Sequence, residues 1–471
     1  MNSSTGISRR RLISSAAAAC AWGARPSWAT EIRKISANDK ANIAFIGIGN
    51  YGAQNLVELA RENIVAVCDV DWRTRAQSPA KTLPASEVAP KYPQAKRFDD
   101  WRVMLESMDK SIDAVVVCTA DHVHAVAAIT AMKMGKHVYC EKPLAHSIGQ
   151  VRAMTAAAKK YPRQATQTGF VGHASEDVRR IVEWVRDGAI GKVEKVEVWQ
   201  SDWAAGQRYT SPYDEVAHVH DRIELPPEVK WDLWLGPAQE RPFNPMYLPL
   251  RWRNWLDFGT GILGDHGPHF LDPVLWALDL GYPVEISADA DAGYDAAVRG
   301  QMFARYSHVN YRFPAKGVRG AVDLKWYGYA TPEIPKGWSS AETFPTGGGI
   351  LHGSKGTLVY GPVYSSKPGV PKQVWLLPDE LDREYKRPEP TIARPQSHWL
   401  EWIDAARAGK QPSANWDYGG FVSEICLLGN IAIQHAGTAL KFSPESRIFT
   451  NSKTANGMFE HGSRPGWHLP A

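Results

Sequence analysis

The sequence predicts two domains: an α/β domain with a doubly wound parallel sheet, then an α+β domain with an open, mainly antiparallel sheet. The chain has 471 residues, too many for one ordinary domain. Apolar strand-like runs alternate with helical patterns up to residue 140, which is typical of a parallel sheet. Beyond residue 190, runs with every second residue apolar favour half-buried strands. We expect domain boundaries at 40–168 and 169–452, with an irregular tail at 453–471.

The first 29 residues have the pattern of an export signal. Arg9, Arg10 and Arg11 precede a short Ala-rich apolar run, and small residues lie before a cleavage site after Ala29. Adjacent arginines before such a run favour the twin-arginine route, whose export machinery moves folded proteins. The alternatives are a disordered basic tail and a lipid anchor at Cys20, which lacks the leucine usually found three residues earlier. We therefore expect a periplasmic or extracellular protein without a membrane anchor.

The rest of the composition argues against several classes of partner. The formal net charge is +4, and the four arginines of the signal account for all of it. The remaining chain is formally neutral, so nothing points to nucleic acid or an anionic membrane surface. Cys68, Cys118 and Cys140 end buried-looking runs, which argues against a disulfide framework. The histidines and acidic residues show no metal-ligand spacing, so no metal is expected.

A glycine-rich turn follows the first strand-like run, which ends at Ile46. Gly47 permits a tight bend, Gly49 lets the backbone approach a pyrophosphate, and Gly52 lets the next helix pack closely on the strand. The turn that would bind the cofactor therefore comprises Gly47, Gly49, Asn50, Tyr51 and Gly52. Asp69 ends the next strand and can accept hydrogen bonds from ribose hydroxyls, which favours NAD over NADP. Arg73 lies near enough in sequence to bind a 2′-phosphate, so NADP stays open.

Polar residues follow two further predicted strands of the same sheet. Thr119 and His124 come after the strand near 112–118, and Glu141 and Lys142 come directly after the strand that ends at Cys140. Ligands bind beyond the carboxyl ends of the strands in such sheets. These four residues therefore belong to the predicted ligand edge.

Several motifs are spread over nearly the whole chain after the signal. They include the glycine turn, Glu141-Lys142-Pro143, Trp252-Arg253, and Asp265 followed four residues later by His269. With these motifs the chain resembles the family of glucose–fructose oxidoreductase and inositol dehydrogenase (Gfo/Idh/MocA), in its long, exported bacterial branch. The resemblance implies a nicotinamide-dependent oxidoreductase for a sugar or polyol. It also implies a homo-oligomer formed through the open face of the sheet.

The resemblance assigns Lys142, Asp265 and His269 to catalysis. Residues i and i+4 share a helix face, so an Asp265 at the helix start and His269 can face one substrate carbon. A histidine can take the hydroxyl proton, while a lysine stabilises the developing oxyanion. Pro268 suits a first helical turn. His266 stays a rival of His269 as the base.

The substrate residues are less well defined than the catalytic set. His173 is one candidate, and Trp252 and Arg253 of the family-like motif are the others. A tryptophan face can stack on a sugar, although packing in the core is the ordinary role of such a residue.

Export constrains the reaction, because free NAD is scarce outside the cytoplasm. The enzyme must then recycle one tightly bound cofactor. Hydride transfer between a donor and an acceptor sugar meets this condition. So does a redox-neutral cycle, such as NAD-dependent glycoside cleavage or epimerisation. A third possibility, from another class, is a non-catalytic sugar- or cofactor-binding protein.

Overall fold

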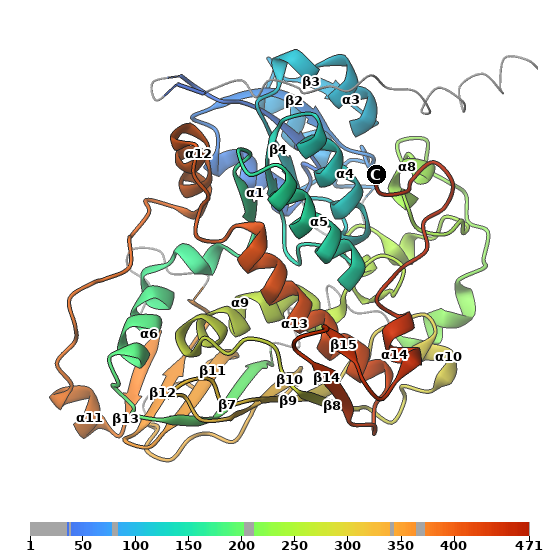
Figure 1. Cartoon of the computed structure of the whole chain (residues 1–471). Coiled ribbons are helices and arrows are strands. Elements are labelled where there is room, and N and C mark those ends of the chain that lie inside the picture. The colour runs from blue at the N-terminus through green and yellow to red at the C-terminus, as the bar shows by residue number, and fades with distance from the viewer. Residues whose placement is uncertain are drawn as a thin grey trace, which may run out of the picture.

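The computed structural model describes residues 35–36, 39–77, 83–201, 212–339, 343–363 and 373–470. The predicted export signal, residues 1–29, lies outside these ranges. A smaller sheet and a larger sheet lie at opposite ends of the molecule in Figure 1. Three helices lie between them, α6 (Glu176–Arg186), α9 (Gly261–Leu278) and α13 (Trp416–Gln434).

The N-terminal sheet has six parallel strands in the order β3-β2-β1-β4-β5-β6. The strands are β1 (Asn42–Ile46), β2 (Asn63–Cys68), β3 (Lys96–Phe98), β4 (Ala114–Val117), β5 (His137–Cys140) and β6 (Thr166–Thr168). The connecting helices are α1 (Tyr51–Glu58), α2 (Ala85–Val88), α3 (Trp101–Ser107), α4 (Asp121–Lys133) and α5 (Ile148–Lys160). Every residue of β4 is buried, as expected for a strand covered on both faces. The predicted doubly wound sheet is confirmed, and its order reverses between β1 and β4, where such sheets bind ligands.

The second sheet has nine strands in the order β13-β12-β11-β7-β10-β9-β8-β14-β15. The strands are β7 (Val193–Gln200), β8 (Glu285–Ala290), β9 (Ser307–Phe313), β10 (Val322–Gly328), β11 (Gly347–Gly353), β12 (Thr357–Tyr360), β13 (Val374–Leu377), β14 (Leu440–Ser443) and β15 (Ile448–Phe449). Strands β7 and β10 pair in parallel, and the other described pairs are antiparallel. The predicted mainly antiparallel sheet is therefore confirmed.

The C-terminal part of the chain returns to the N-terminal sheet. The remaining α-helices after the N-terminal sheet are α8 (Trp231–Leu235), α10 (Ala296–Arg299), α11 (Asp379–Glu384), α12 (His398–Ala408) and α14 (Lys453–Gly457). Ser397 and Asn415 begin α12 and α13 by accepting backbone N–H groups, as side chains do at helix starts. Trp402 of α12 then packs against Tyr139 of β5 and donates to the carbonyl of Ala165. None of the helices in the described ranges is long and apolar enough to cross a membrane.

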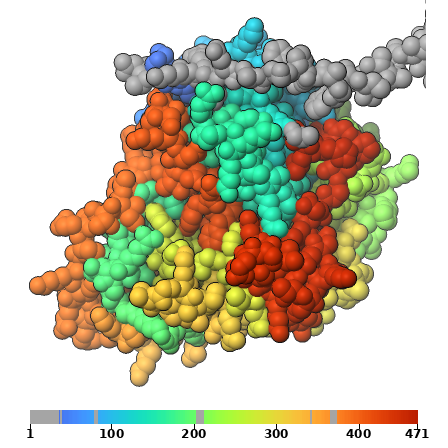
Figure 2. Space-filling view, viewed as in Figure 1, coloured from blue at the N-terminus to red at the C-terminus, as the bar shows by residue number. Residues whose placement is uncertain are grey.

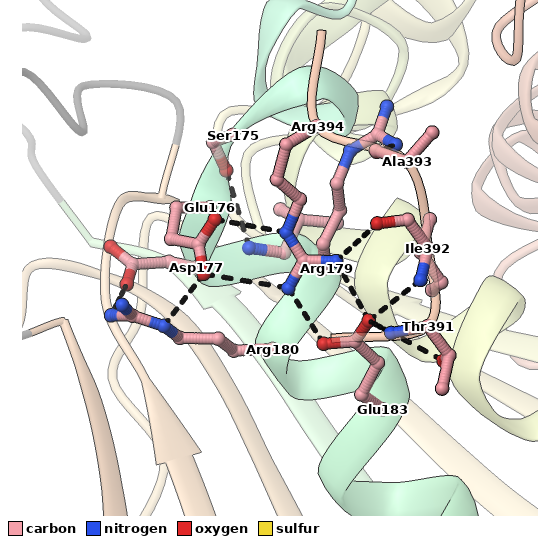
Figure 3. A network of polar contacts seen from close by, with 11 residues as sticks. Ser175, Glu176, Asp177, Arg179, Arg180, Glu183, Thr391, Ile392, Ala393 and Arg394 are labelled. Atoms are coloured by element: carbon pink, nitrogen blue, oxygen red, sulfur yellow. Dashed lines mark hydrogen bonds and ion pairs between the residues drawn. The ribbon is translucent and has the colours of Figure 1, made fainter. Parts of the chain in front are cut away.

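An ionic network fastens the segment before α12 to α6 (Figure 3). Arg394 lies between two glutamates of α6, with Nε 2.9 Å from Glu176 Oε2 and Nη2 2.6 Å from Glu183 Oε2. Glu183 also accepts the backbone N–H groups of Thr391 and Ile392. The hydrogen bond from Arg394 is the main cause that lowers the pKa of Glu183 to about 2. The network therefore fixes the path of the chain toward α12.

Candidate active site

A cavity of about 550 Å³ lies where the parallel strands end, and it receives residues from both halves of the chain. The N-terminal half contributes the glycine turn and the residues that follow β2, β4 and β5. The second half contributes Trp234 of α8, Trp252 and Arg253, and three residues of α9. This volume is in the usual range for small-molecule and cofactor sites.

The glycine turn has the shape that a bound pyrophosphate requires. A Cβ atom at Gly47, where φ is +84°, would lie 2.3 Å from the carbonyl oxygen of Cys118. A Cβ at Gly52 would lie 2.3 Å from the carbonyl oxygen of Gly47, so α1 packs on the turn only with glycine there. Gly49 is less crowded, because a Cβ there would lie 3.6 Å or more from its nearest neighbours, at ordinary van der Waals distance. The turn is thus closely packed on the protein at Gly47 and Gly52, and Gly49 lines the cavity, which fits a dinucleotide.

Asp69 lies at the end of β2, beside the same turn. Its Oδ2 accepts the backbone N–H groups of Ile48 (2.9 Å) and Gly49 (3.2 Å). Burial raises the pKa of Asp69 above its usual value, although these N–H groups oppose the shift. Arg73 also lines the cavity, but it makes a bidentate ion pair with Asp71, at 2.8 and 2.6 Å. The guanidinium that sequence reasoning left available for a 2′-phosphate is therefore already paired.

Lys142 and Asp265 meet at the other end of the cavity. Lys142 Nζ donates a hydrogen bond to Asp265 Oδ1, and a second one of 2.8 Å to the Asp265 carbonyl oxygen. Arg253 Nε lies 3.3 Å from Asp265 Oδ2. Burial opposes ionisation of Asp265, but the charges of Lys142 and Arg253 outweigh it and hold the pKa of this carboxyl well below its usual range. Asp265 is therefore an anion that holds two cations at the cavity wall.

Two histidines of α9 line the cavity next to this cluster. His266 Nε2 lies 3.6 Å from Asp265 Oδ2, and its Nδ1 lies 3.0 Å from the side-chain nitrogen of Gln200, the last residue of β7. His269 lies one helical turn after Asp265. Burial and the charge of Lys142 lower the pKa of His269 well below its usual value. His269 is therefore neutral at neutral pH.

The predicted start of this helix is corrected. Helix α9 begins at Gly261, where φ is +61°, and not near Asp265. Pro268 is consequently inside the helix and not in its first turn. The left-handed backbone at Gly261 allows the chain to enter the helix one turn earlier than the proline suggested.

Two predicted site residues, His124 and His173, are not among the residues that line the cavity. His124 is fully buried, with its ring nitrogens 3.0 Å from the carbonyl oxygen of Pro143 and 3.2 Å from that of Thr119. His173 is buried as well, with Nδ1 3.0 Å from Asp272 and its ring stacked on Trp276. Both imidazoles therefore make these contacts in the protein interior. Thr119, Trp252 and Arg253, three other predicted site residues, line the cavity.

Two buried carboxyls stand out among the cavity residues. Asp121, the first residue of α4, accepts a 2.6 Å hydrogen bond from the Thr260 hydroxyl, and burial raises its pKa to about 7. Glu141 accepts a 2.9 Å hydrogen bond from Asn55, and burial raises its pKa to about 7 as well. Both residues follow strand ends, so the rule that placed Glu141 could also have found Asp121. Gln200 comes from the second sheet, and no local signal in the sequence indicates it.

Among the described residues, no group of three or more His, Cys, Asp or Glu side chains is arranged to hold a metal ion.

Comparisons with known proteins agree with this geometry. Residues 41–170 match an oxidoreductase family with an NAD-binding Rossmann fold, and residues 174–317 match the C-terminal α/β domain of that family. Inositol 2-dehydrogenase/D-chiro-inositol 3-dehydrogenase of Lactiplantibacillus plantarum is 30% identical over 211 residues, which cover 43% of this chain and 55% of that protein. Glycosyl hydrolase family 109 protein 1 of Akkermansia muciniphila is 28% identical over 160 residues, 32% of each protein.

A solved structure shares the whole two-domain fold. Aldose–aldose oxidoreductase of Caulobacter crescentus has a TM-score of 0.55 and 18% identity, and the comparison covers 86% of this chain and 100% of that chain. The first curated relatives are matched over only about half of their length. Fold and family matches together place the protein in the class of oxidoreductases with an NAD-binding Rossmann domain. The chain belongs to the Gfo/Idh/MocA family, as its motifs predicted.

Proposed function

We propose that this chain is an NAD-dependent oxidoreductase that acts on a secondary alcohol of a sugar or polyol. One observation carries the proposal: the glycine turn and the Lys142–Asp265 pair line the same cavity. A dinucleotide on the turn and an alcohol beside Lys142 would therefore share one enclosed space. Inositol and levoglucosan dehydrogenases are among the curated relatives, which supports this class of substrate.

The dinucleotide would be held by the glycine turn and by Asp69. Bound NAD would supply the hydride acceptor. Asp69 suits ribose hydroxyls and would repel a 2′-phosphate. Arg73 is already paired with Asp71, so its positive charge is not offered to a 2′-phosphate. This pairing also favours NAD.

At the substrate end of the cavity, protein side chains would accept the proton of the substrate hydroxyl. We assign His269 as the base, since a neutral imidazole can accept the proton that an alcohol releases on oxidation. Lys142 would stabilise the developing charge on the oxygen, and Asp265 would fix the ammonium group by its two hydrogen bonds. Trp252 and Arg253, which line the cavity beside this cluster, would contact the sugar.

We further propose that the protein is exported and keeps its cofactor bound. The arginine-rich N-terminal pattern supports export by the twin-arginine route, and scarcity of NAD outside the cytoplasm then requires recycling. Transfer of the hydride from a donor sugar to an acceptor sugar would satisfy this requirement. A homo-oligomer formed through the open sheet remains our expectation.

A second candidate function is redox-neutral glycoside cleavage. The similarity to a glycosyl hydrolase family 109 protein supports it, because transient oxidation of a sugar can labilise a neighbouring bond. The same cavity and the same base would serve both reactions. The two functions differ in whether reduced cofactor accumulates.

The test follows the absorbance of reduced nicotinamide in the purified protein as single sugars are added. Sugar-to-sugar transfer predicts a stable rise, which reverses only when a second carbonyl compound is added. Release of an aglycone from a glycoside without net reduction would support cleavage instead. Binding of NAD and sugar without either signal would leave a binding protein as the answer.

A further inference from the structure

The segment after α14 is packed into the protein and is not a loose tail. Phe459, Arg464 and Trp467 are each less than 10% exposed, at 7%, 8% and 5%. The segment has no regular secondary structure beyond α14 up to residue 470. In Figure 1 it runs from α14 to the end of the chain beside α4 and α8. In Figure 2 these C-terminal residues lie on the surface next to the helices of the N-terminal domain.

Arg464 fastens this segment to α8. Its guanidinium donates to the carbonyl oxygens of Asp232 and Gly236 and to the Asp232 carboxylate. Gly236 directly follows the last residue of α8, and a cation is favourable at this end of a helix. Leu233 and Trp234 of the same helix line the cavity. Arg464 thus holds one wall of the cavity from behind.

Trp467 fastens the segment to α3, in the other half of the protein. Its ring meets Trp101 edge to face, with centroids 6.3 Å apart, and the Arg102 guanidinium lies 4.1 Å above it. Such contacts stabilise aromatic pairs beyond simple burial. Trp101 itself lines the cavity. Trp467 thus supports a second wall, which belongs to the N-terminal domain.

The part of the segment that precedes Arg464 and Trp467 is held in place as well. The carbonyl oxygen of Phe459 accepts the backbone N–H of Gly149 at 2.8 Å. A Cβ atom at Gly149 would overlap the carboxylate of Glu460, so α5 makes room for the segment. The ring of His461 packs on that of His146 at a tilt of 37°, with ring centroids 4.5 Å apart. Before Arg464, the segment is therefore seated on α5 and on the residues that precede it in the N-terminal domain.

Trp101, the tryptophan in the cavity wall supported in this way, is itself buried, at 5% exposure. The indole nitrogen of Trp101 is buried and, within the described residues, has no hydrogen-bond acceptor. The position of this tryptophan depends on the contact with Trp467.

We infer that Arg464 and Trp467 are positioning residues that join the α3 and α8 walls and slow the release of the dinucleotide. The inference rests on the proposed function for the identity of the ligand. It explains from the structure why the dinucleotide would stay bound, which neither the glycine turn nor Asp69 explains. The segment contacts both halves at once, so its loss would let the two walls separate.

The experiment measures the rate at which NADH leaves the full-length protein. The protein is loaded with NADH and diluted into excess NAD, and the loss of bound-NADH fluorescence is followed for wild type, Trp467→Ala and Arg464→Ala. Trp338→Ala and Arg383→Ala are matched controls. Trp338 packs on Phe344 and Trp375, and Arg383 pairs with Glu380 on α11, so both lie outside the cavity lining. Asp69→Ala tests whether NADH occupies the predicted site.

We expect NADH to leave at least ten times faster from Trp467→Ala and Arg464→Ala, and at the wild-type rate from both controls. Melting temperatures distinguish this effect from general loss of stability, because Trp338→Ala should lower the melting temperature without changing the release rate. Wild-type release rates in folded Trp467→Ala and Arg464→Ala would overturn the inference. If wild type and Asp69→Ala both fail to bind NADH, the proposed function fails instead.

Discussion

The two ends of the cavity are built in different ways. At the dinucleotide end, the glycine turn and Asp69 lie in one continuous stretch, residues 47–73, whose shape is set by glycines and backbone N–H groups. The substrate end joins Lys142, Gln200, Arg253 and His269 of α9, which are up to 127 residues apart along the chain. Local backbone geometry therefore fixes the first end, whereas packing of the two domains and paired charges fix the second. Substitutions at the two ends should consequently affect different properties.

The largest effect is expected at the base. His269→Gln should lower turnover about 10²- to 10⁴-fold and leave NADH binding unchanged, because the proton acceptor is lost but the dinucleotide end is intact. His266→Gln is the matched control and should cost much less. The reverse order would make His266 the base. Turnover is measured with a sugar that reduces the bound cofactor, and NADH binding by fluorescence.

The pH dependence adds a second readout for the same group. The pKa of His269 is lowered below its ordinary value of 6.5, so the imidazole stays neutral on acidification past that pH. The turnover of the wild type should therefore hold at pH 6 and fall only at lower pH, as the ring becomes protonated. A fall centred at pH 6.5 would contradict a buried base.

Lys142→Met should lower turnover about 10²- to 10³-fold, because it removes the donor at the developing oxyanion. Release of NADH should change little. Lys316→Met is a control, since that lysine makes an exposed ion pair with Asp279. Unchanged turnover in Lys142→Met would show that the ammonium only supports Asp265.

The same contrast explains what the sequence could predict. The positions of Gly47, Gly49 and Asp69 follow from a single strand–turn–helix–strand unit, in which spacing determines geometry. Lys142 and Asp265 came from the family motifs, and the structure brings their side chains together. Gln200 and Trp467 could not be found, because their neighbours depend on how two domains and a distant segment pack. The start of α9 was misplaced since proline in a first turn is the commoner arrangement.

The free energy of unfolding should depend on pH because of the ionisation of Glu141. In the folded protein the pKa of Glu141 is about 7, above its ordinary 4.5, so the folded state retains a proton that the unfolded state releases between these pH values. Stability therefore falls as pH rises through this window. Glu141→Gln removes this loss and should raise the free energy of unfolding at pH 8 relative to pH 5 by up to about 3 kcal/mol.

The free energies of unfolding are measured in denaturant without added dinucleotide. Glu183→Gln is the control. The pKa of Glu183 is about 2, so its contribution is present at both pH 5 and pH 8. The effect of Glu183→Gln should therefore be the same at the two values. An equal effect of Glu141→Gln at both would contradict a protonated Glu141.

The smallest effect concerns the choice of dinucleotide. Asp71→Asn weakens the pairing of Arg73 and should improve NADPH binding several-fold, while NADH binding changes little. Asp71→Asn with Arg73→Ala should remove the gain. Equal affinities for NADPH before and after the first substitution would show that Arg73 does not face the 2′ position.

The central claim is that both ends of the cavity act on one retained cofactor, and an isotope experiment tests it most directly. A donor sugar deuterated at the carbon to be oxidised is supplied with an acceptor sugar and an excess of unlabelled free NADH. Mass spectrometry then follows the label. We predict that the deuterium appears undiluted in the reduced acceptor. Dilution of the label by the free NADH would contradict a retained cofactor, and absence of the label from the acceptor would contradict transfer between sugars.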